Sequence, residues 1–241
     1  MTTTITTTTL DTIATLERAP SVLKVKEIFR RAIEKHGYEH FLCSAPPRPQ
    51  DSQYDPVLFE EWPPAWRRRY SRRRYFVCDP MLLELYRTAD PFSWADVLDR
   101  GTNSAAERAV MHDASAWGMN EGFVVPIYGI GGQMHAVTMS GRAPRSDLTA
   151  RAELHLLSIY AYGRAKFLAG RETDPTPVLR PHERETLLWA AAGKSDWEIS
   201  RILRVSEGAI HKRIEAIKRR MGVGTRVQAI VAAIRSGQIA L

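Results

Sequence analysis

The chain contains 241 residues, enough for one large domain or two smaller ones, and 44% hydrophobic with 25% charged residues is a globular rather than a disordered composition. Its net charge of +7 is unevenly spread, because residues 171–241 hold 13 basic against 8 acidic side chains, whereas residues 1–170 hold 21 against 19. This distribution favours a polyanionic partner for the C-terminal third.

The two cysteines and the N-terminal residues indicate in which cellular compartment the protein is expected. Cys43 and Cys78 form neither a metal-binding spacing nor a disulfide framework, which is typical of a reducing cytoplasm. Residues 1–10 form a threonine-rich tract that we expect to be a disordered tail and not a secretory signal. The longest apolar stretches are too short to span a bilayer, so the sequence predicts a cytoplasmic protein without membrane contact.

Helix and strand patterns alternate through the first two thirds of the chain. Apolar spacing of 3.6 or 2 residues predicts helices over 21–37, 62–74, 104–117 and 146–168, a strand over 40–44, and a hairpin of 123–128 with 133–140 around the glycine-rich turn 129–132. Ser146 is the expected cap of the last helix. Because the segments follow no βαβ rhythm, we predict an α+β fold, an antiparallel sheet sandwiched between helices.

A domain boundary is expected at residues 171–177, where two prolines interrupt the helical pattern. The predicted organisation is a ligand-binding domain over 11–170, this linker, and an all-helical domain over 178–241.

The C-terminal segment predicts four helices, with a helix-turn-helix at its centre. Pro181 suits a first helical turn, and Gly193 suits the residue after that helix. Ser195 and Glu198 form a capping box, and Ser206 can cap the next helix after a very short turn. Two helices joined so tightly are typical of a DNA-binding helix-turn-helix.

The helix after Ser206 has an apolar and a polar face. One stripe holds Ile210, Ile214, Ile217 and Met221, which we expect to face the core. The polar side chains suit a recognition helix: His211, Lys212 and Glu215 would meet base edges, while Arg219 and the helix N-terminus at Ser206 would meet phosphate. The alternative is a solvated basic face on a plain helical bundle.

This segment resembles the LuxR-type output domain over about sixty residues. The matching stretch reads Leu179-Arg-Pro-His-Glu183, Leu187 to Ser195, Glu198-Ile-Ser, Leu203 to Ser206, Ile210, Lys218, Met221-Gly-Val and Arg226-Val-Gln-Ala. It departs from the family at Arg180, which replaces a capping Thr or Ser, at the small Gly208 and Ala209, and at Arg213, which replaces a histidine. The resemblance implies DNA binding and adds Arg213 and Lys194 to the predicted DNA-binding residues. Response regulators share this domain, but the N-terminal part lacks the repeated βα pattern of a receiver.

The N-terminal part carries a second spaced motif: Trp66, Tyr70, Asp79-Pro80, Pro91-Phe92-Ser93-Trp94 and Gly122. Aromatic residues at helical spacing are most often core, and Asp-Pro is most often a turn. The whole pattern, however, resembles the autoinducer-binding domain of quorum-sensing LuxR-type receptors, which implies an N-acyl homoserine lactone as ligand.

The resemblance assigns roles to individual side chains. Trp66 would donate to the lactone carbonyl, Asp79 would accept from the ligand amide N–H, and Tyr70 would donate to the amide carbonyl. Thr138 would add a hydrogen bond. Trp94 and Phe92 would line the lactone end of the site, and Trp62 would flank the helix at the pocket. Met81, Leu82, Met111 and Met119 would line the end of the acyl chain. These bulky side chains suggest a compact acyl group, branched or aromatic. Without ligand, an ionised Asp79 would lack a partner, so folding and binding should be coupled.

Two arginine runs, 67–69 and 72–74, lie on the same predicted helix as Trp66 and Tyr70. A second DNA site is one interpretation. We favour the solvated outer face of the helix that covers the pocket.

Together the motifs predict a ligand-gated transcriptional regulator, without cofactor or metal, that acts as a homodimer on a two-fold symmetric DNA site and contacts RNA polymerase. The dimer follows from an apolar stripe of Val227, Ile230, Val231 and Ile234. Two alternatives remain open: an orphan regulator that senses another small molecule or none, and a lactone hydrolase fused to a DNA-binding domain. The pair His112-Asp113 is the only feature of the sequence that suggests a hydrolase. It has no metal-ligand partners at a recognisable spacing, and the sequence has no nucleophile-elbow motif.

Overall fold

The structure is a computed structural model that describes residues 7–46, 57–101, 104–129, 134–172 and 179–240. The chain divides into two compact units, one of residues 1–127 with 134–172 and one of residues 128–133 with 173–241. Among the described residues, no helix is both long enough and apolar enough to cross a membrane.

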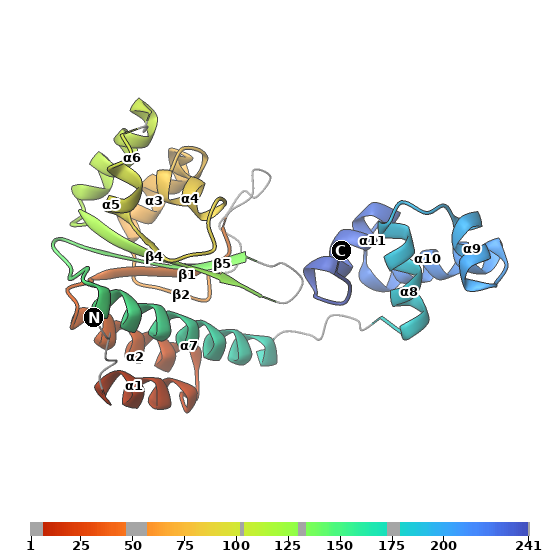
Figure 1. Cartoon of the computed structure of the whole chain (residues 1–241), viewed down its shortest axis with the longest axis horizontal. Coiled ribbons are helices and arrows are strands. Elements are labelled where there is room, and N and C mark those ends of the chain that lie inside the picture. Colours follow the sequence, from red (N-terminus) through yellow and green to blue (C-terminus); the bar gives the residue numbers. More distant parts are fainter. Residues whose placement is uncertain (1–6, 47–56, 102–103, 130–133, 173–178, 241) are drawn as a thin grey trace. The chain divides into compact units, whose positions relative to one another are not determined.

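The N-terminal unit is a five-stranded sheet covered by helices on both faces (Figure 1). The strands follow the order β2-β1-β5-β4-β3. Their bounds are β1 His40–Ser44, β2 Phe59–Glu60, β3 Phe92–Ser93, β4 Glu121–Tyr128 and β5 Met134–Gly141. The neighbours of β1 run antiparallel to it, with Leu42 opposite Thr138 in β5. The predicted α+β class with an antiparallel sheet is confirmed.

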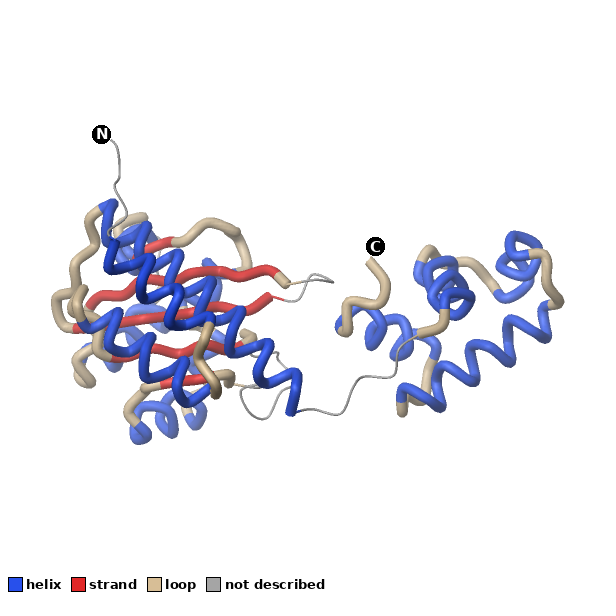
Figure 2. The backbone as a smooth tube through the Cα atoms, turned by 90° about the horizontal axis from the view of Figure 1, so that it is seen from below, coloured by secondary structure: helices blue, strands red, loops and turns tan. Residues whose placement is uncertain are grey.

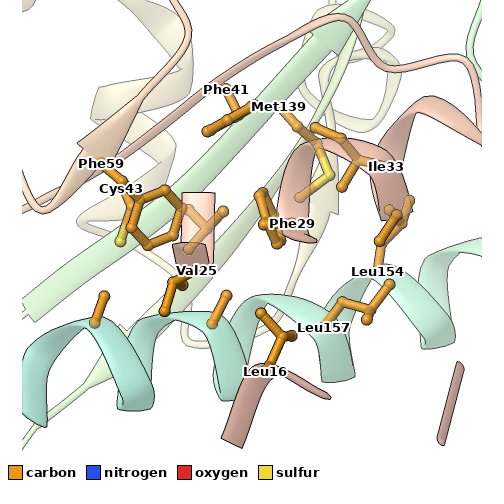
Figure 3. Close-up of a cluster of buried hydrophobic side chains, with 14 of the residues drawn as sticks. Leu16, Val25, Phe29, Ile33, Phe41, Cys43, Phe59, Met139, Leu154 and Leu157 are labelled. Carbon is orange, nitrogen blue, oxygen red and sulfur yellow. The ribbon is translucent and has the colours of Figure 1, made fainter. Parts of the chain in front are cut away.

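One face of the sheet carries α1 Thr7–Glu17, α2 Val22–Glu34 and α7 Leu148–Glu172, which run side by side across the strands (Figure 2). Their apolar stripes bury Val25, Phe29, Leu154 and Leu157 against the side chains of Phe41, Cys43, Phe59 and Met139 (Figure 3). This is the main core of the unit. It supports the sheet from behind and leaves the opposite face for the site.

The opposite face carries the shorter elements α3 Pro64–Arg72, η1 Tyr75–Val77, α4 Pro80–Leu85, α5 Trp94–Leu98 and α6 Ala105–Ser115 (Figure 1). Side chains alternate between the faces of a strand. Leu42 and Thr138 therefore face α3–α6, whereas their neighbours Phe41 and Met139 face α2 and α7. Several of these helices have side-chain caps, such as Ser93 with Asp96 and Ser104 with Glu107.

Some predicted boundaries differ from the structure. The disordered tail predicted for residues 1–10 is wrong over Thr7–Leu10, which begin α1; residues 1–6 lie outside the described residues. Asp147, not Ser146, caps α7, since its Oδ1 accepts from the Ala150 N–H at 3.0 Å. The two-residue strands β2 and β3 were too short to show any periodicity. The predicted linker overlaps α7 at 171–172, and its residues 173–177 lie outside the described part, as do residues 130–132 of the hairpin turn.

The C-terminal unit consists of four helices, as predicted: α8 Pro181–Ala191, α9 Asp196–Leu203, α10 Glu207–Met221 and α11 Arg226–Arg235. The Ser195–Glu198 capping box and the Ser206 cap are both present. At Arg180 the side chain does not cap α8, but Glu183 accepts from the Arg180 N–H at 2.7 Å. Ile210, Ile214 and Ile217 are buried, which fixes the inner face of α10.

The turn between α9 and α10 depends on Arg204, whose φ of 55° lies in the left-handed region. That conformation costs a residue with a Cβ about 1 kcal/mol, and glycine avoids the cost. We expect Arg204→Gly to raise the free energy of local unfolding of α9 and α10 by up to about 1 kcal/mol. Hydrogen exchange of their amides measures this. Lys212→Gly, in the regular interior of α10, should lower the same quantity by about 1 kcal/mol, and a loss in both variants would contradict the explanation.

Candidate functional site

The N-terminal unit encloses a cavity between its sheet and helices α3, α4 and α6. The strands contribute the floor, with Leu42, Ser44, Val124, Ala136, Thr138 and Ser140. The helices and loops contribute aromatic and apolar walls: Trp62, Trp66, Tyr70, Met81, Leu82, Leu85, Trp94, Val110, Met111, Ala114 and Met119. Asp79 is the one carboxylate on this wall among the described residues.

Helix α3 places its two aromatic side chains in the cavity because Trp66 and Tyr70 are four residues apart. Both side chains are about 2% exposed. Their rings lie 5.7 Å apart, and the Trp62 ring lies 5.4 Å from that of Tyr70. Three aromatic groups thus form one wall with fixed ring orientations.

Two indole N–H groups on the cavity wall have no hydrogen-bond partner among the described residues: Nε1 of Trp66 and Nε1 of Trp94. A buried donor without an acceptor costs about 1–3 kcal/mol, and native proteins rarely keep one without a reason. A ligand with carbonyl oxygens would remove this cost.

Asp79 caps α4 and is held from two sides. Its Oδ1 accepts from the Met81 N–H at 2.9 Å, and its Oδ2 accepts from the Tyr70 hydroxyl at 2.7 Å. Burial raises the pKa of Asp79, and these hydrogen bonds oppose the shift. The expectation that Asp79 lacks a partner without ligand is therefore wrong: Tyr70, nine residues earlier, supplies one.

The Tyr70 hydroxyl has a single proton, which it gives to Asp79. In this state the hydroxyl is therefore not available for the ligand amide carbonyl, the acceptor that the sequence predicted for it. A ligand amide N–H that reached Asp79 could take over the role of Tyr70 and free the hydroxyl for the ligand. The site can thus exchange one set of hydrogen bonds for another.

Thr138 lies on β5 at the cavity floor, where the one partner of its hydroxyl among the described residues is the Leu42 carbonyl, at a long 3.5 Å. Phe92 does not line the cavity. It is buried beside it, in a cluster with Met81, Leu85 and Val124, and supports the wall from behind. The remaining predicted ligand residues all line the cavity, and the small floor residues Ser44, Ala136 and Ser140 were missed because small side chains carry no pattern.

Gly122 packs directly against Trp94. A Cβ at this position would overlap the Trp94 indole and the Met139 carbonyl oxygen. The sequence motif included Gly122 without a physical reason, and the structure supplies one: only glycine leaves room for the indole in its observed position.

We expect Gly122→Ala to displace the Trp94 indole and to lower the free energy of unfolding by about 1–3 kcal/mol, the usual cost of overpacking. Ligand-induced stabilisation, measured by thermal melting, should fall with it. Gly163→Ala in α7 is the matched control, since an added Cβ there meets nothing within 4 Å and should stabilise the helix. Equal behaviour of the two variants would contradict the role of Gly122.

In the C-terminal unit, α10 exposes a polar face opposite its buried isoleucines. Lys212 and Arg219 are exposed and have no ion-pair partner among the described residues. His211 is exposed, with Nδ1 3.6 Å from Asp196. Glu215 accepts from Lys218 Nζ at 2.7 Å, and this hydrogen bond lowers the pKa of Glu215.

Two further predicted DNA-binding residues, Arg213 and Lys194, also have partners within the unit. Arg213 turns toward α8, where it donates to Thr186 Oγ1 at 2.8 Å and to the His182 carbonyl at 3.1 Å. Its role in this structure is to join two helices. Lys194 pairs with Glu198 at 3.0 Å near the start of α9, and Ser206 is exposed at the start of α10.

Comparison with known proteins agrees with both sites. Residues 21–165 match the autoinducer binding domain, and residues 177–233 match the family of bacterial regulatory proteins called the luxR family. The chain is a LuxR-family transcriptional regulator.

Its relatives include the transcriptional activator protein BjaR1 of Bradyrhizobium diazoefficiens, 30% identical over 85% of this chain and 84% of that protein. The quorum sensing-dependent regulator RpaR of Rhodopseudomonas palustris is also 30% identical, over 96% of this chain and 93% of that one. Escherichia coli SdiA shares the fold, with a TM-score of 0.76 at 19% identity over 95% of this chain and 96% of SdiA.

LuxR-family regulators are not enzymes, so the hydrolase alternative is set aside. The pair that suggested it has another role: Asp113 accepts from Arg69 at 2.7 and 2.9 Å and from the Tyr75 hydroxyl. These bonds hold the pKa of Asp113 down at about 2 and tie α6 to α3.

Proposed function

We propose that this regulator is gated by an N-acyl homoserine lactone. The observation that carries the proposal is the pair of unpartnered indole donors, Trp66 and Trp94, on one apolar cavity wall with the acceptor Asp79. An acyl homoserine lactone has two carbonyl groups and one amide N–H, which complements two donors and one acceptor. Met81, Met111 and Met119 would cover a compact acyl group, branched or aromatic.

The output is control of promoters in the cytoplasm by a homodimer on a two-fold symmetric site. On α11 the predicted apolar stripe divides: Ile230 and Ile234 pack inward, whereas Val227 and Val231 are 68% and 40% exposed. The exposed pair supports a contact with a second copy. An exposed Trp197 on α9 is a suitable contact for RNA polymerase. The domain boundary proposed near residues 171–177 is supported by the end of α7 at Glu172.

The decisive experiment is recovery of the ligand. The protein is expressed beside a lactone synthase or incubated with a lactone panel, then extracted with solvent and analysed by mass spectrometry. An intact lactone in equimolar amount supports the proposal. Protein that recovers none, yet still binds DNA, is an orphan regulator, and the gating proposal then fails.

A further inference from the structure

The outer face of α3 holds a concentration of charge that the ligand site does not use. Between residues 67 and 74 the chain has six arginines and no lysine. Trp66 and Tyr70 turn inward, whereas five of the six arginines are exposed and the sixth, Arg69, is half-buried.

These arginines dominate the charge of their unit. Residues 1–170 hold 21 basic and 19 acidic side chains, so without these six arginines the same segment has a net charge of −4. Only two carboxylates pair with the cluster among the described residues: Glu60 with Arg67, and Asp113 with Arg69 and, at 3.8 Å, Arg73. Like charges on one helix face repel each other by a few tenths of a kcal/mol per pair. The described residues therefore leave most of this positive charge without compensation.

Arg68, Arg72 and Arg74 have no side-chain ion pair or hydrogen bond in the described part of the chain, and Arg74 lies over the ring of Phe76 at 5.3 Å, which leaves Arg68 and Arg72 without a side-chain partner there. Both are exposed, and they lie one helical turn apart. With Arg69 they line a shallow hollow whose other walls are Ala65 and the half-buried Trp117. A guanidinium fork suits phosphate oxygens, and it binds them in pairs more readily than an ammonium group does.

The exposure of this face agrees with the solvated outer face favoured from the sequence, but its unpaired charge favours the second interpretation as well: we propose that this face, Arg68 and Arg72 above all, binds the phosphate backbone of duplex DNA without sequence specificity. The C-terminal unit belongs to a family of DNA-binding regulators, and the chain tethers any duplex bound there to this face, which raises the effective concentration of DNA. A membrane is a poorer match, because interfacial helices place large apolar side chains beside their cations, and both large apolar side chains of α3 face inward. The cluster adds affinity to the specific contact of α10.

The test measures the affinity of the full chain for a duplex of scrambled sequence over a series of salt concentrations. Each phosphate contact contributes about 0.9 to the slope of log K against log salt. We expect Arg68→Ala/Arg72→Ala to reduce this slope by about two and to weaken binding at low salt. Arg68→Lys/Arg72→Lys keeps the charge and should retain the slope. Both alanine substitutions are on an exposed helix face, so the melting temperature should not fall.

Arg18→Ala/Lys35→Ala is the matched control. It removes the same charge from exposed positions directly after α1 and α2, helices on the opposite side of the sheet (Figure 1), and should leave the slope unchanged. The proposal is overturned if the Arg68/Arg72 variant and this control have the same slope. It is also overturned if the variant binds DNA like the wild type but loses retention on vesicles of phosphatidylcholine and phosphatidylglycerol, which would assign the face to anionic lipid.

Discussion

Asp79→Ala is expected to remove most of the response to ligand. The variant loses the acceptor for the ligand amide, and hydrogen bonds to charged groups contribute about 1.5–3 kcal/mol, which corresponds to roughly a 10- to 150-fold loss of affinity. Wild-type protein should melt at a higher temperature with lactone, by mass action, and Asp79→Ala should show little of this shift. The variant without ligand should also be less stable by about 1 kcal/mol, because Asp79 caps α4.

Asp79→Asn separates these two effects. Asparagine keeps the cap and the contact with Tyr70 but not the charge. Burial raises the pKa of Asp79, so the stability that its protonated form contributes is present below the unfolded pKa and is lost as the pH rises through the folded pKa. Without ligand, the melting temperature of the asparagine variant should therefore rise relative to that of the wild type as the pH rises through this range. An amide N–H on the carboxylate favours its charged form, so the ligand-induced shift of the wild type should increase with pH.

Thermal melting across a pH series, with and without lactone, measures both predictions. If Asp79→Ala responds to lactone as strongly as the wild type, Asp79 does not bind the ligand amide. If the shift of the wild type is the same at acid and neutral pH while that of Asp79→Asn varies, the carboxylate is not the titrating group. Tyr70→Phe is a useful companion, because it removes the hydroxyl that holds Asp79 in the structure without ligand.

Much of the fold could be predicted from patterns between residues that are close together in the sequence. The C-terminal helices were predicted because each has a cap that is local in sequence, such as Ser195 with Glu198 and Ser206 with the Ala209 N–H. The hairpin of β4 and β5 was predicted because two apolar runs flank a glycine-rich turn. The strands β2 and β3 escaped detection because two residues contain no period.

The sequence did not predict which side chains become hydrogen-bond or packing partners when the chain folds. Nothing in the spacing of Tyr70 and Asp79 indicates that the hydroxyl donates to the carboxylate. Arg213 has the composition of a DNA contact, yet Thr186, 27 residues earlier, takes its guanidinium. Phe92 belongs to the motif but acts from behind the wall. In each case the residue type indicated whether the side chain has a polar or an apolar role. Its partner residue depends on tertiary contacts, which the sequence does not show.

The second prediction with a large expected effect concerns the recognition of base pairs by α10. We predict that Lys212 and Glu215 meet base edges, Lys212 at guanine O6 or N7 and Glu215 at a cytosine amino group. Glu215 is bound by Lys218 in the free protein, so it must exchange this partner for the base when DNA arrives. Arg219 lies further along the exposed side of α10, where it would contact phosphate and carry no sequence information.

These roles predict different phenotypes for two substitutions on one helix. Glu215→Ala should cost about 1–3 kcal/mol on the cognate site and relax the preference at one base pair of each half-site. Arg219→Ala should weaken cognate and scrambled duplexes alike and reduce the salt slope by about one. Arg213→Ala is the control for a structural role: it should lower the melting temperature of the C-terminal unit, because it removes the hydrogen bonds to α8, and should leave base preference unchanged. Binding to a panel of singly substituted sites at several salt concentrations distinguishes the three. Should Arg219→Ala change base preference while Glu215→Ala does not, the two roles are reversed, and α10 enters the groove with its C-terminal half toward the bases.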